Sequence, residues 1–138
     1  EGGYEIEKIR LVDEYDADDE RSMADNNSSA FNYRVVADTN TISAHSYGRA
    51  IDINPLINPY IVGNKGMPAN KQRKTSKCKG KYKRYMIHKN DTAYKIFKKY
   101  GFSWGGEWRS SKDYQHFYKE YDSPLKMAVN KLKRALLR

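Results

Sequence analysis

The stretch ISAHSYGRAIDINP, at residues 42–55, constrains the fold more than any other part of the chain. Its second half alternates in polarity, because Asp52 lies between Ile51 and Ile53. Such alternation predicts a half-buried strand with its isoleucines on one face and Asp52 on the other. A strand that served packing alone would have no use for this aspartate or for His45 in the polar, glycine-flanked turn before it. The stretch therefore predicts a strand that also carries a functional site.

The other patterns predict an α+β fold, in which helices pack on a small, mainly antiparallel sheet. With 138 residues, the chain fits a single domain over 1–138. One helix is expected at 90–101, where Asn90 or Asp91 can cap the start and Gly101 can end it. A second, amphipathic helix is expected at 123–138. The segments expected to be strands are 31–37, 51–54, 112–118 and the two ends of 102–108 around a Gly-Gly turn. The segment 4–12 suits a strand or a short helix. We expect an irregular segment at 13–30 and a loop at 55–68.

Charge is distributed unevenly along the chain, whose net charge is +9. Residues 65–85 carry nine Lys or Arg and no acid, whereas residues 1–25 carry ten acids and three bases. A basic loop of this kind attracts an anionic polymer such as nucleic acid, teichoic acid or peptidoglycan, or it serves only to keep the protein soluble. The single cysteine, Cys78, excludes an internal disulfide and a cysteine-based zinc site.

The sequence contains no apolar run of the length that a membrane span needs, so we expect no transmembrane segment in this chain. Its first residues, EGGYEIEKIR, contain no apolar signal core. For an exported protein, we therefore expect a leader that is not present in this chain.

Two of the three histidines lie where a metal ion can be bound. His45 precedes Asp52 by seven residues, and His116 lies in a second predicted strand, three residues after Asp113. Three nitrogen and oxygen ligands with one open position are typical of catalytic zinc, and a nearby carboxylate can act as general base. We therefore expect His45, Asp52 and His116 to bind one Zn²⁺, with Asp113 as the base. The alternative is that both histidines are structural, and His88, beside the basic segment, is expected at the surface.

Four segments carry a more specific pattern. They are ERSMADNNSSAFNYR, then SAHSYGRAID followed by INPLINPY, then YKIFKKYGFSWGGEW, and finally DYQHF. The elements S-x-H-x-x-G-x-A-x-D and D-x-x-H are the most distinctive among them. Over residues 20–118 the chain resembles the zinc D-alanyl-D-alanine carboxypeptidases of the VanY type, a family that also includes phage L-alanyl-D-glutamate endopeptidases. The resemblance implies the same zinc ligands and the same general base.

The resemblance also implies roles for other residues. Arg34 would hold the scissile carbonyl or its oxyanion, where a fixed cation stabilises the charge that develops. The alternative for Arg34 is a surface ion pair. Four further residues would line the pocket or contact substrate: Ser43, Tyr47, Asp25 and Asn27. Trp104 and Trp108 form one wall of the cleft or belong to the core.

One position departs from the family pattern. Many relatives have a glutamate two residues after the last ligand, where this chain has Tyr118.

The function expected from these features is hydrolysis of a peptidoglycan stem peptide outside the cytoplasm. D-alanyl-D-alanine carboxypeptidase is favoured over L-alanyl-D-glutamate endopeptidase. One alternative is a zinc-containing module that binds the cell wall without turnover. Another is a basic metal-dependent nuclease, although the stretch HSYGRAIDIN lacks a second histidine that could act on a phosphodiester, and nucleic acid is not the expected partner.

Overall fold

The computed structural model of the chain describes residues 3–36, 39–62, 65–66, 85–120 and 135. The predicted C-terminal helix at 123–138, apart from Ala135, lies outside the described residues. So do Cys78 and most of the basic segment 65–85.

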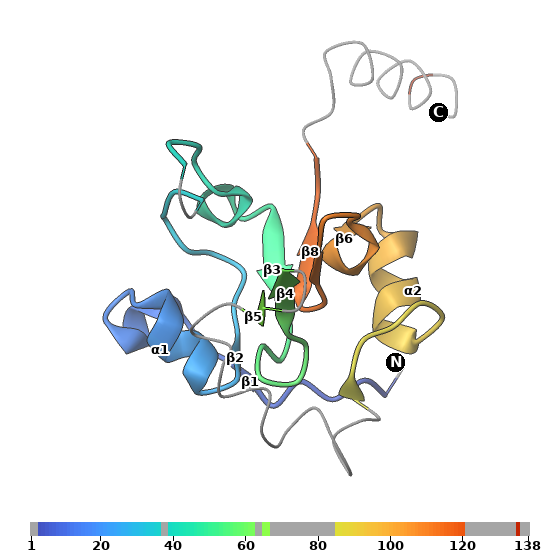
Figure 1. Ribbon diagram of the computed structural model, residues 1–138, viewed down its shortest axis with the longest axis horizontal. Coiled ribbons are helices and arrows are strands. Elements are labelled where there is room, and N and C mark those ends of the chain that lie inside the picture. Colours follow the sequence, from blue (N-terminus) through green and yellow to red (C-terminus); the bar gives the residue numbers. More distant parts are fainter. Residues whose placement is uncertain (1–2, 37–38, 63–64, 67–84, 121–134, 136–138) are drawn as a thin grey trace.

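The central sheet has three antiparallel strands in the order β3-β8-β6, with bounds Ala50–Asp52, His116–Tyr118 and Ser103–Trp104 (Figure 1). Because β8 lies between the other two strands, Phe117 at its middle is fully buried. The strand predicted at 51–54 is therefore present, although β3 begins one residue earlier and ends at Asp52, and it contributes one edge of the central sheet.

Two smaller sheets flank the central one. Strands β5 (Lys65–Gly66), β4 (Tyr60–Val62) and β7 (Ser111–Asp113) form an antiparallel sheet in that order. Strands β1 (Lys8–Ile9) and β2 (Asn27–Ser28) form a parallel pair. With helices on these mainly antiparallel sheets, the predicted α+β class is confirmed.

Helix α2 (Thr92–Lys99) lies within the predicted 90–101, and the predicted residues Asp91 and Gly101 flank it. The Asp91 carboxylate accepts a hydrogen bond from the Tyr94 amide at 2.7 Å, which caps the first turn. Gly101 adopts a left-handed φ of 80°, and the Phe102 amide reaches back to the Phe97 carbonyl at 3.0 Å. This Schellman arrangement brings the rings of Phe97 and Phe102 into edge contact, which closes the end of the helix.

The core lies between α2 and the central sheet. Phe97 stacks on Phe117 with ring centroids 4.2 Å apart, and Trp104 packs edge-on against Tyr94. The buried apolar residues of this cluster are Ile53, Ile87, Ala93, Trp104 and Phe117. The sheet edge that carries the predicted site therefore rests on a well-packed aromatic core.

Several predicted segments are corrected by the structure. Residues 13–30 are not irregular throughout, because they contain the 3-10 helix η1 (Val12–Tyr15, beginning one residue earlier) and helix α1 (Asp19–Ala24). The Asp18 carboxylate caps α1 by accepting from the amides of Glu20 and Arg21. This helix has almost no apolar stripe, so its start is set by capping and by the acids in its first turn.

The described part of 31–37 is not a strand, although its residues favour one. Only Val35 makes a bridge, to Ile42, and the side chains of Phe31 and Tyr33 are exposed. Without a partner strand and a face to bury, β-branched and aromatic residues do not by themselves form a ladder.

Conversely, the predicted loop 55–68 contains β4 and β5. The three residues YIV after Pro59 are too few to predict a strand by themselves. They form β4 because β7 pairs with them.

The predicted strand 112–118 is two strands in different sheets, β7 and β8. The chain bends at Tyr114 and Gln115, whose backbone groups bond to the Pro59 carbonyl and the Ile53 amide at 3.1 and 3.0 Å. The predicted second strand within 102–108 is instead the 3-10 helix η5 (Gly105–Glu107). There, a Cβ on Gly106 would lie 2.3 Å from the Trp104 ring, so the glycine lets the indole fold under the turn.

Candidate metal centre

His45 is presented by a short 3-10 helix, η2 (Ala44–Tyr47). Ser43 caps this helix by accepting from the His45 amide at 3.3 Å, and Gly48 ends it with a left-handed φ of 62°. The His45 carbonyl accepts from the amides of Gly48 and Asn32 at 3.1 and 3.3 Å. Because both sides of the residue are held, its imidazole is fixed in a buried position.

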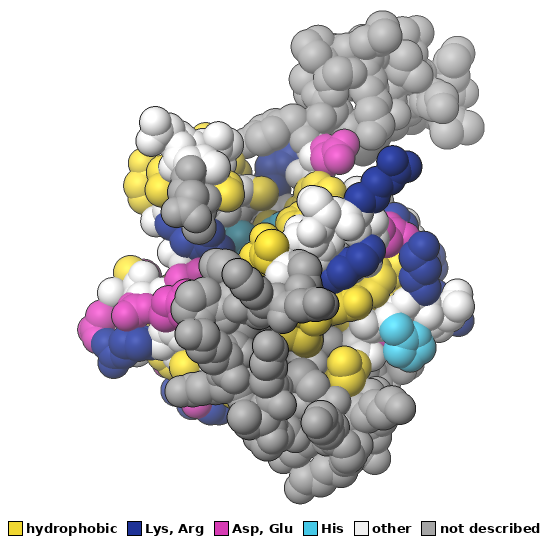
Figure 2. Space-filling model, in the orientation of Figure 1, with side chains coloured by type: hydrophobic (Ala, Val, Ile, Leu, Met, Phe, Trp, Pro, Cys, Tyr) yellow, Lys and Arg dark blue, Asp and Glu magenta, His cyan; other side chains and the backbone are white. Residues whose placement is uncertain are grey.

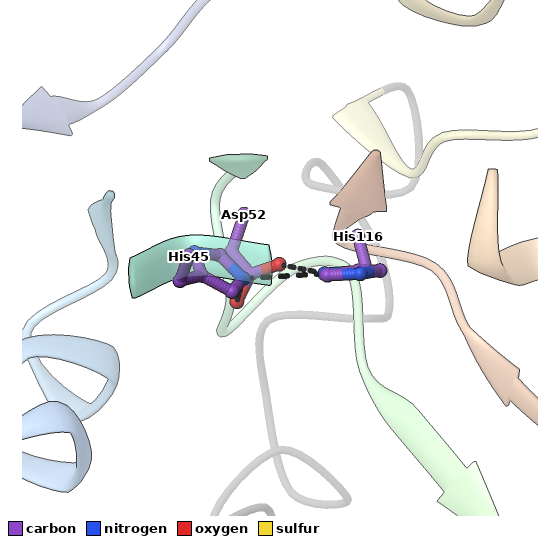
Figure 3. Close-up of side chains that lie close together, drawn as sticks. All are labelled: His45, Asp52 and His116. Atoms are coloured by element: carbon purple, nitrogen blue, oxygen red, sulfur yellow. Dashed lines mark hydrogen bonds and ion pairs between the residues drawn. The ribbon is translucent and has the colours of Figure 1, made fainter. Parts of the chain in front are cut away.

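Asp52 and His116 lie directly opposite each other on β3 and β8. His116 Nδ1 lies 2.8 Å from Asp52 Oδ1, and His45 Nε2 lies 3.3 Å from both Asp52 Oδ2 and His116 Nδ1 (Figure 3). The structure thus brings together the three side chains that the sequence predicts, although 71 positions separate the two histidines. The third histidine, His88, is exposed, as predicted.

These three side chains fit a zinc ion. One atom from each residue can be chosen so that all lie within 4.8 Å of one another. A tetrahedral zinc with bonds of about 2.0–2.1 Å separates its ligand atoms by roughly 3.3–3.4 Å. The two distances from His45 Nε2 have this length, and the donor set of two imidazoles and one carboxylate suits zinc. His45, Asp52 and His116 can therefore hold one metal ion.

The surroundings of Asp52 and His116 shift the pKa values of these two groups. Burial by itself raises the pKa of Asp52, but the charge of His45 and the hydrogen bond from His116 outweigh it, so the pKa lies below its ordinary value. Burial by itself lowers the pKa of His116, but the hydrogen bond to Asp52 and the charge of this carboxylate raise it above its ordinary value. The carboxylate is therefore ionised at neutral pH, as a metal ligand must be.

Asp113 is the last residue of strand β7 and comes directly before the bend that leads to His116. Its Oδ1 is buried. The negative charge of Asp113 contributes to the raised pKa of His116, so the two groups interact. Gly105 lies against Asp113, because a Cβ there would be 2.7 Å from the Asp113 carbonyl oxygen and 2.8 Å from its Cβ. The close approach of the η5 backbone therefore restricts the position of the Asp113 Cβ atom.

Arg34 is joined through its backbone to the helix that carries His45. The Arg34 amide donates to Ser46 Oγ at 2.9 Å, and the Arg34 carbonyl accepts from the Ser43 amide at 3.0 Å. Its positive charge acts to lower the pKa of His116, against the effect of Asp113. A cation and a carboxylate thus both influence this candidate ligand.

Aromatic rings cover one side of His116. The rings of Tyr118 and Trp108 lie 5.3 and 5.6 Å from it, centroid to centroid, and Trp108 Nε1 donates to the Tyr118 hydroxyl at 3.2 Å. Trp108 is partly buried beside the candidate metal site. Trp104, by contrast, belongs to the core, where Nε1 donates to the Tyr114 carbonyl at 2.9 Å.

The other predicted substrate contacts have definite partners or positions. Ser43 is buried and caps η2, and Tyr47 is exposed on the same helix. Asp25 pairs with Lys8 at the surface. Asn27 is fully buried, with Oδ1 accepting from the Arg10 amide at 2.8 Å. Of these four, Tyr47 and Asp25 are exposed, and the roles of all four stay predictions.

Exposed apolar side chains gather on the segment that leads into η2. Figure 2 shows hydrophobic side chains on the lobe at the upper left, over this part of the chain. The exposed large apolar residues of the segment are Phe31, Tyr33, Val35, Val36, Ile42 and Tyr47. They make an apolar flank beside the helix that carries His45.

Two residues near the site were not predicted from the sequence. Gln115 is buried and donates from Nε2 to Asp52 Oδ2 at 3.5 Å. Asp19 lies 3.2 Å from Arg34 Nε. For Gln115, the position between two predicted site residues in DYQHF was an available signal. For Asp19 there was no such signal, because nothing in its segment predicts where it lies relative to Arg34.

The sequence model of a known family matches residues 37–119, more than half of the chain, and is described as D-alanyl-D-alanine carboxypeptidase. The chain belongs to the D-alanyl-D-alanine carboxypeptidase family. No curated protein and no solved structure matches it. The match contains His45, Asp52, Asp113 and His116, and it begins after Arg34.

Membership of this peptidase family makes the chain a zinc metallopeptidase that acts on peptidoglycan, and it favours a peptidase over the nuclease considered above. Among the helices of the described residues, none has both the length and the apolar character needed to cross a membrane.

Proposed function

We propose that this carboxypeptidase-family chain hydrolyses a stem-peptide bond of peptidoglycan and that the bond is D-alanyl-D-alanine rather than L-alanyl-D-glutamate. The convergence of His45, Asp52 and His116 carries the proposal, because all three lie within the residues that match the family. The family description favours the carboxypeptidase reaction over the endopeptidase reaction.

His45 Nε2, His116 Nδ1 and one Asp52 oxygen are the proposed ligands of a single Zn²⁺. When bound, zinc supplies a Lewis acid that polarises the substrate carbonyl and makes water acidic enough to attack near neutral pH. The burial of His45 and Asp52 keeps solvent away from two of the ligands, and the His116 side chain, which is 13% exposed, lies on the side from which substrate can approach.

Asp113 is the proposed general base. It takes the proton from the attacking water and then gives it to the amine of the leaving residue. Its interaction with His116 and its fixed position against Gly105 support this role. A carboxylate held by the backbone in this way loses little conformational freedom when substrate binds.

Arg34 is the proposed electrostatic stabiliser. As water adds to the amide carbon, negative charge develops on the carbonyl oxygen, and a guanidinium held near this position would stabilise it. The support is the anchoring of the Arg34 backbone to η2 and the influence of its charge on His116.

For the substrate, we propose that Trp108 and Tyr118 form one wall and Tyr47 another part of the rim. The apolar ring faces suit the methyl side chains of alanine residues. The stem peptide lies in the cell wall, so the proposed place of action is outside the cytoplasm. The basic segment 65–85 is suited to an anionic wall polymer.

Product analysis tests the reaction. The zinc-loaded protein is incubated with a stem pentapeptide ending in D-alanyl-D-alanine and, separately, with one that ends in a single D-alanine. Mass spectrometry should show loss of one terminal alanine from the first peptide and no cut in the second. Release of an N-terminal L-alanine fragment from both peptides would replace the carboxypeptidase proposal with the endopeptidase. Binding to cell walls without either product would favour the wall-binding module.

A further inference from the structure

Arg34 makes one ion pair in the described part of the chain, and its partner is Asp19 at the start of α1. Asp19 Oδ2 lies 3.2 Å from Arg34 Nε, and the two side chains are 23% and 32% exposed. We propose that Asp19 is a positioning residue: its carboxylate turns the Arg34 guanidinium so that the terminal nitrogens face the scissile carbonyl. The inference rests on the proposed role of Arg34 and extends it to a residue outside the family match.

The Asp19 carboxylate is itself held in place. Asn32 Nδ2 donates to its other oxygen, Oδ1, at 3.0 Å. Asn32 is buried, its amide donates to the His45 carbonyl at 3.3 Å, and its own carbonyl accepts from Ser46 Oγ at 3.2 Å. Asp19 is thus connected through one asparagine to the turn that carries a proposed metal ligand. The backbone of η2 therefore holds both His45 and, through Asn32, the carboxylate that pairs with Arg34.

The division of the guanidinium between two tasks follows from its geometry. Arginine has five N–H donors in a rigid plane, one on Nε and four on the terminal nitrogens. Arg34 Nε is buried and lies 3.2 Å from Asp19 Oδ2, which is an ion-pair contact without hydrogen-bond geometry, although the side chain as a whole keeps part of its surface exposed. Within the described residues, the terminal nitrogens make no hydrogen bond. They are therefore the donors left for an oxyanion.

A donor that is oriented before the reaction stabilises the transition state without rearranging during it. A long arginine side chain on an extended segment would otherwise sample several rotamers. The segment around Arg34 forms no strand, so the backbone alone does not restrict the guanidinium. Asp19 supplies this restriction through the charge of its carboxylate, which lies beside Nε and away from the terminal nitrogens' proposed task.

Asp19→Asn tests the inference, with Asp16→Asn as the matched control. Asp16 also pairs with an arginine, Arg21, near α1, but this pair is far more exposed, with Asp16 at 80%. Both substitutions remove one negative charge from the same region. Arg34→Ala and the double variant with Asp19→Asn complete the set, and for each protein kcat, KM, bound zinc and the thermal unfolding midpoint are measured on the stem peptide that the wild type cleaves.

We expect Arg34→Ala to lower kcat about 100-fold, the usual effect of losing one oxyanion donor. Asp19→Asn should lower kcat about 10-fold with KM and zinc content unchanged, because the arginine remains but is no longer aligned. In the Arg34→Ala background, Asp19→Asn should change kcat by less than about 2-fold, since a residue that acts through Arg34 has nothing left to act on. Asp16→Asn should behave as the wild type.

Three results would overturn the inference. They are an undiminished kcat in Asp19→Asn, equal losses in Asp19→Asn and Asp16→Asn, or a full additional loss in the double variant. If Arg34→Ala keeps the wild-type kcat, the proposed role of Arg34 fails as well.

Crystal structures keep the test independent of activity. The Arg34 guanidinium should occupy one position in the wild type and in Asp16→Asn, and leave it in Asp19→Asn. An unmoved guanidinium in Asp19→Asn would overturn the inference even if the wild type cleaved neither stem peptide, an outcome that would separately remove the proposed function.

Discussion

Asp52 and His116 face each other in register across β3 and β8, and their side chains meet at 2.8 Å between Oδ1 and Nδ1. One antiparallel cross-strand pair therefore supplies two of the three candidate ligands. Directly opposite residues of such a pair have closely spaced Cβ atoms, so the backbone itself brings both side chains together. His45 completes the set from a capped turn, and a sheet backed by an aromatic core keeps the geometry rigid.

Zinc content should depend on Asp52 and not on His88. Asp52→Asn keeps the shape of the side chain but removes the ligand charge, and zinc affinity should fall by at least about 100-fold, the upper end of what loss of a supporting group causes. Equilibrium dialysis with metal analysis measures this. His88→Ala is the control, because it removes an exposed histidine and should leave close to one zinc per chain. Full zinc occupancy in Asp52→Asn at low free zinc would contradict the site.

Asp113→Asn should separate zinc binding from catalysis. The amide is isosteric with the carboxylate but cannot accept the proton of water, so kcat should fall by about 10²–10⁴-fold. Bound zinc and the unfolding midpoint should stay near the wild-type values, because Asp113 is not a proposed ligand. Steady-state kinetics on the stem peptide, with metal analysis of the same sample, checks both. An unchanged kcat would remove Asp113 from its role.

Gly105→Ala should lower activity through Asp113. The added Cβ would lie 2.7 Å from the Asp113 carbonyl oxygen, so one backbone segment must move, at a cost of about 1–3 kcal/mol in the free energy of unfolding. Gly101→Ala is the control: its Cβ would meet nothing within 4 Å, and only the left-handed φ of 80° makes it unfavourable, by about 1 kcal/mol. Urea unfolding should show both losses, but kcat should fall only in Gly105→Ala. Equal kcat values in the two variants would show that the contact does not position the base.

The effect of zinc on stability should grow as pH rises. In the metal-free protein the pKa of His116 is raised, so protonation of its ring stabilises the fold below the unfolded value of about 6.5, and this contribution disappears as pH rises through the raised pKa. The pKa of Asp52 is lowered, so its contribution is present above about 3.9 and is lost only in acid. Zinc requires deprotonated imidazoles, so it binds more tightly at higher pH.

The measurement is the unfolding midpoint with zinc and with a chelator between pH 5.5 and 8. The difference between the two samples should widen with pH, because the chelated protein loses the His116 contribution while zinc gains affinity. A constant or narrowing difference would mean that zinc does not compete with protons at these imidazoles. The Asp52→Asn variant should show no such difference at any pH.

Local features of the sequence were sufficient for much of the fold. Asp91 and Gly101 define α2, because a cap and a left-handed residue act on the backbone next to them. The alternation around Asp52 predicts β3, because side chains of a strand point to opposite faces in turn. The set of His45, Asp52 and His116 was predicted mainly from the resemblance of SAHSYGRAID and DYQHF to the family pattern, since the spacing alone also allowed structural histidines.

Pairing and burial were decided only by the tertiary structure. Residues 31–36 favour a strand but have no partner ladder, whereas Tyr60–Val62 became a strand because β7 lies beside it. The break between Asp113 and His116 likewise depends on distant backbone partners, Pro59 and Ile53.

The same holds for the side chains around the site. The contact between Asp19 and Arg34 needs α1 and an irregular segment to meet, and no local pattern fixes that meeting. The sequence by itself determined which groups can bind a metal and which short stretches are helix or strand, because these depend on neighbouring residues. The tertiary structure determined which strands pair and which charges meet, because these depend on contacts between residues far apart in the chain.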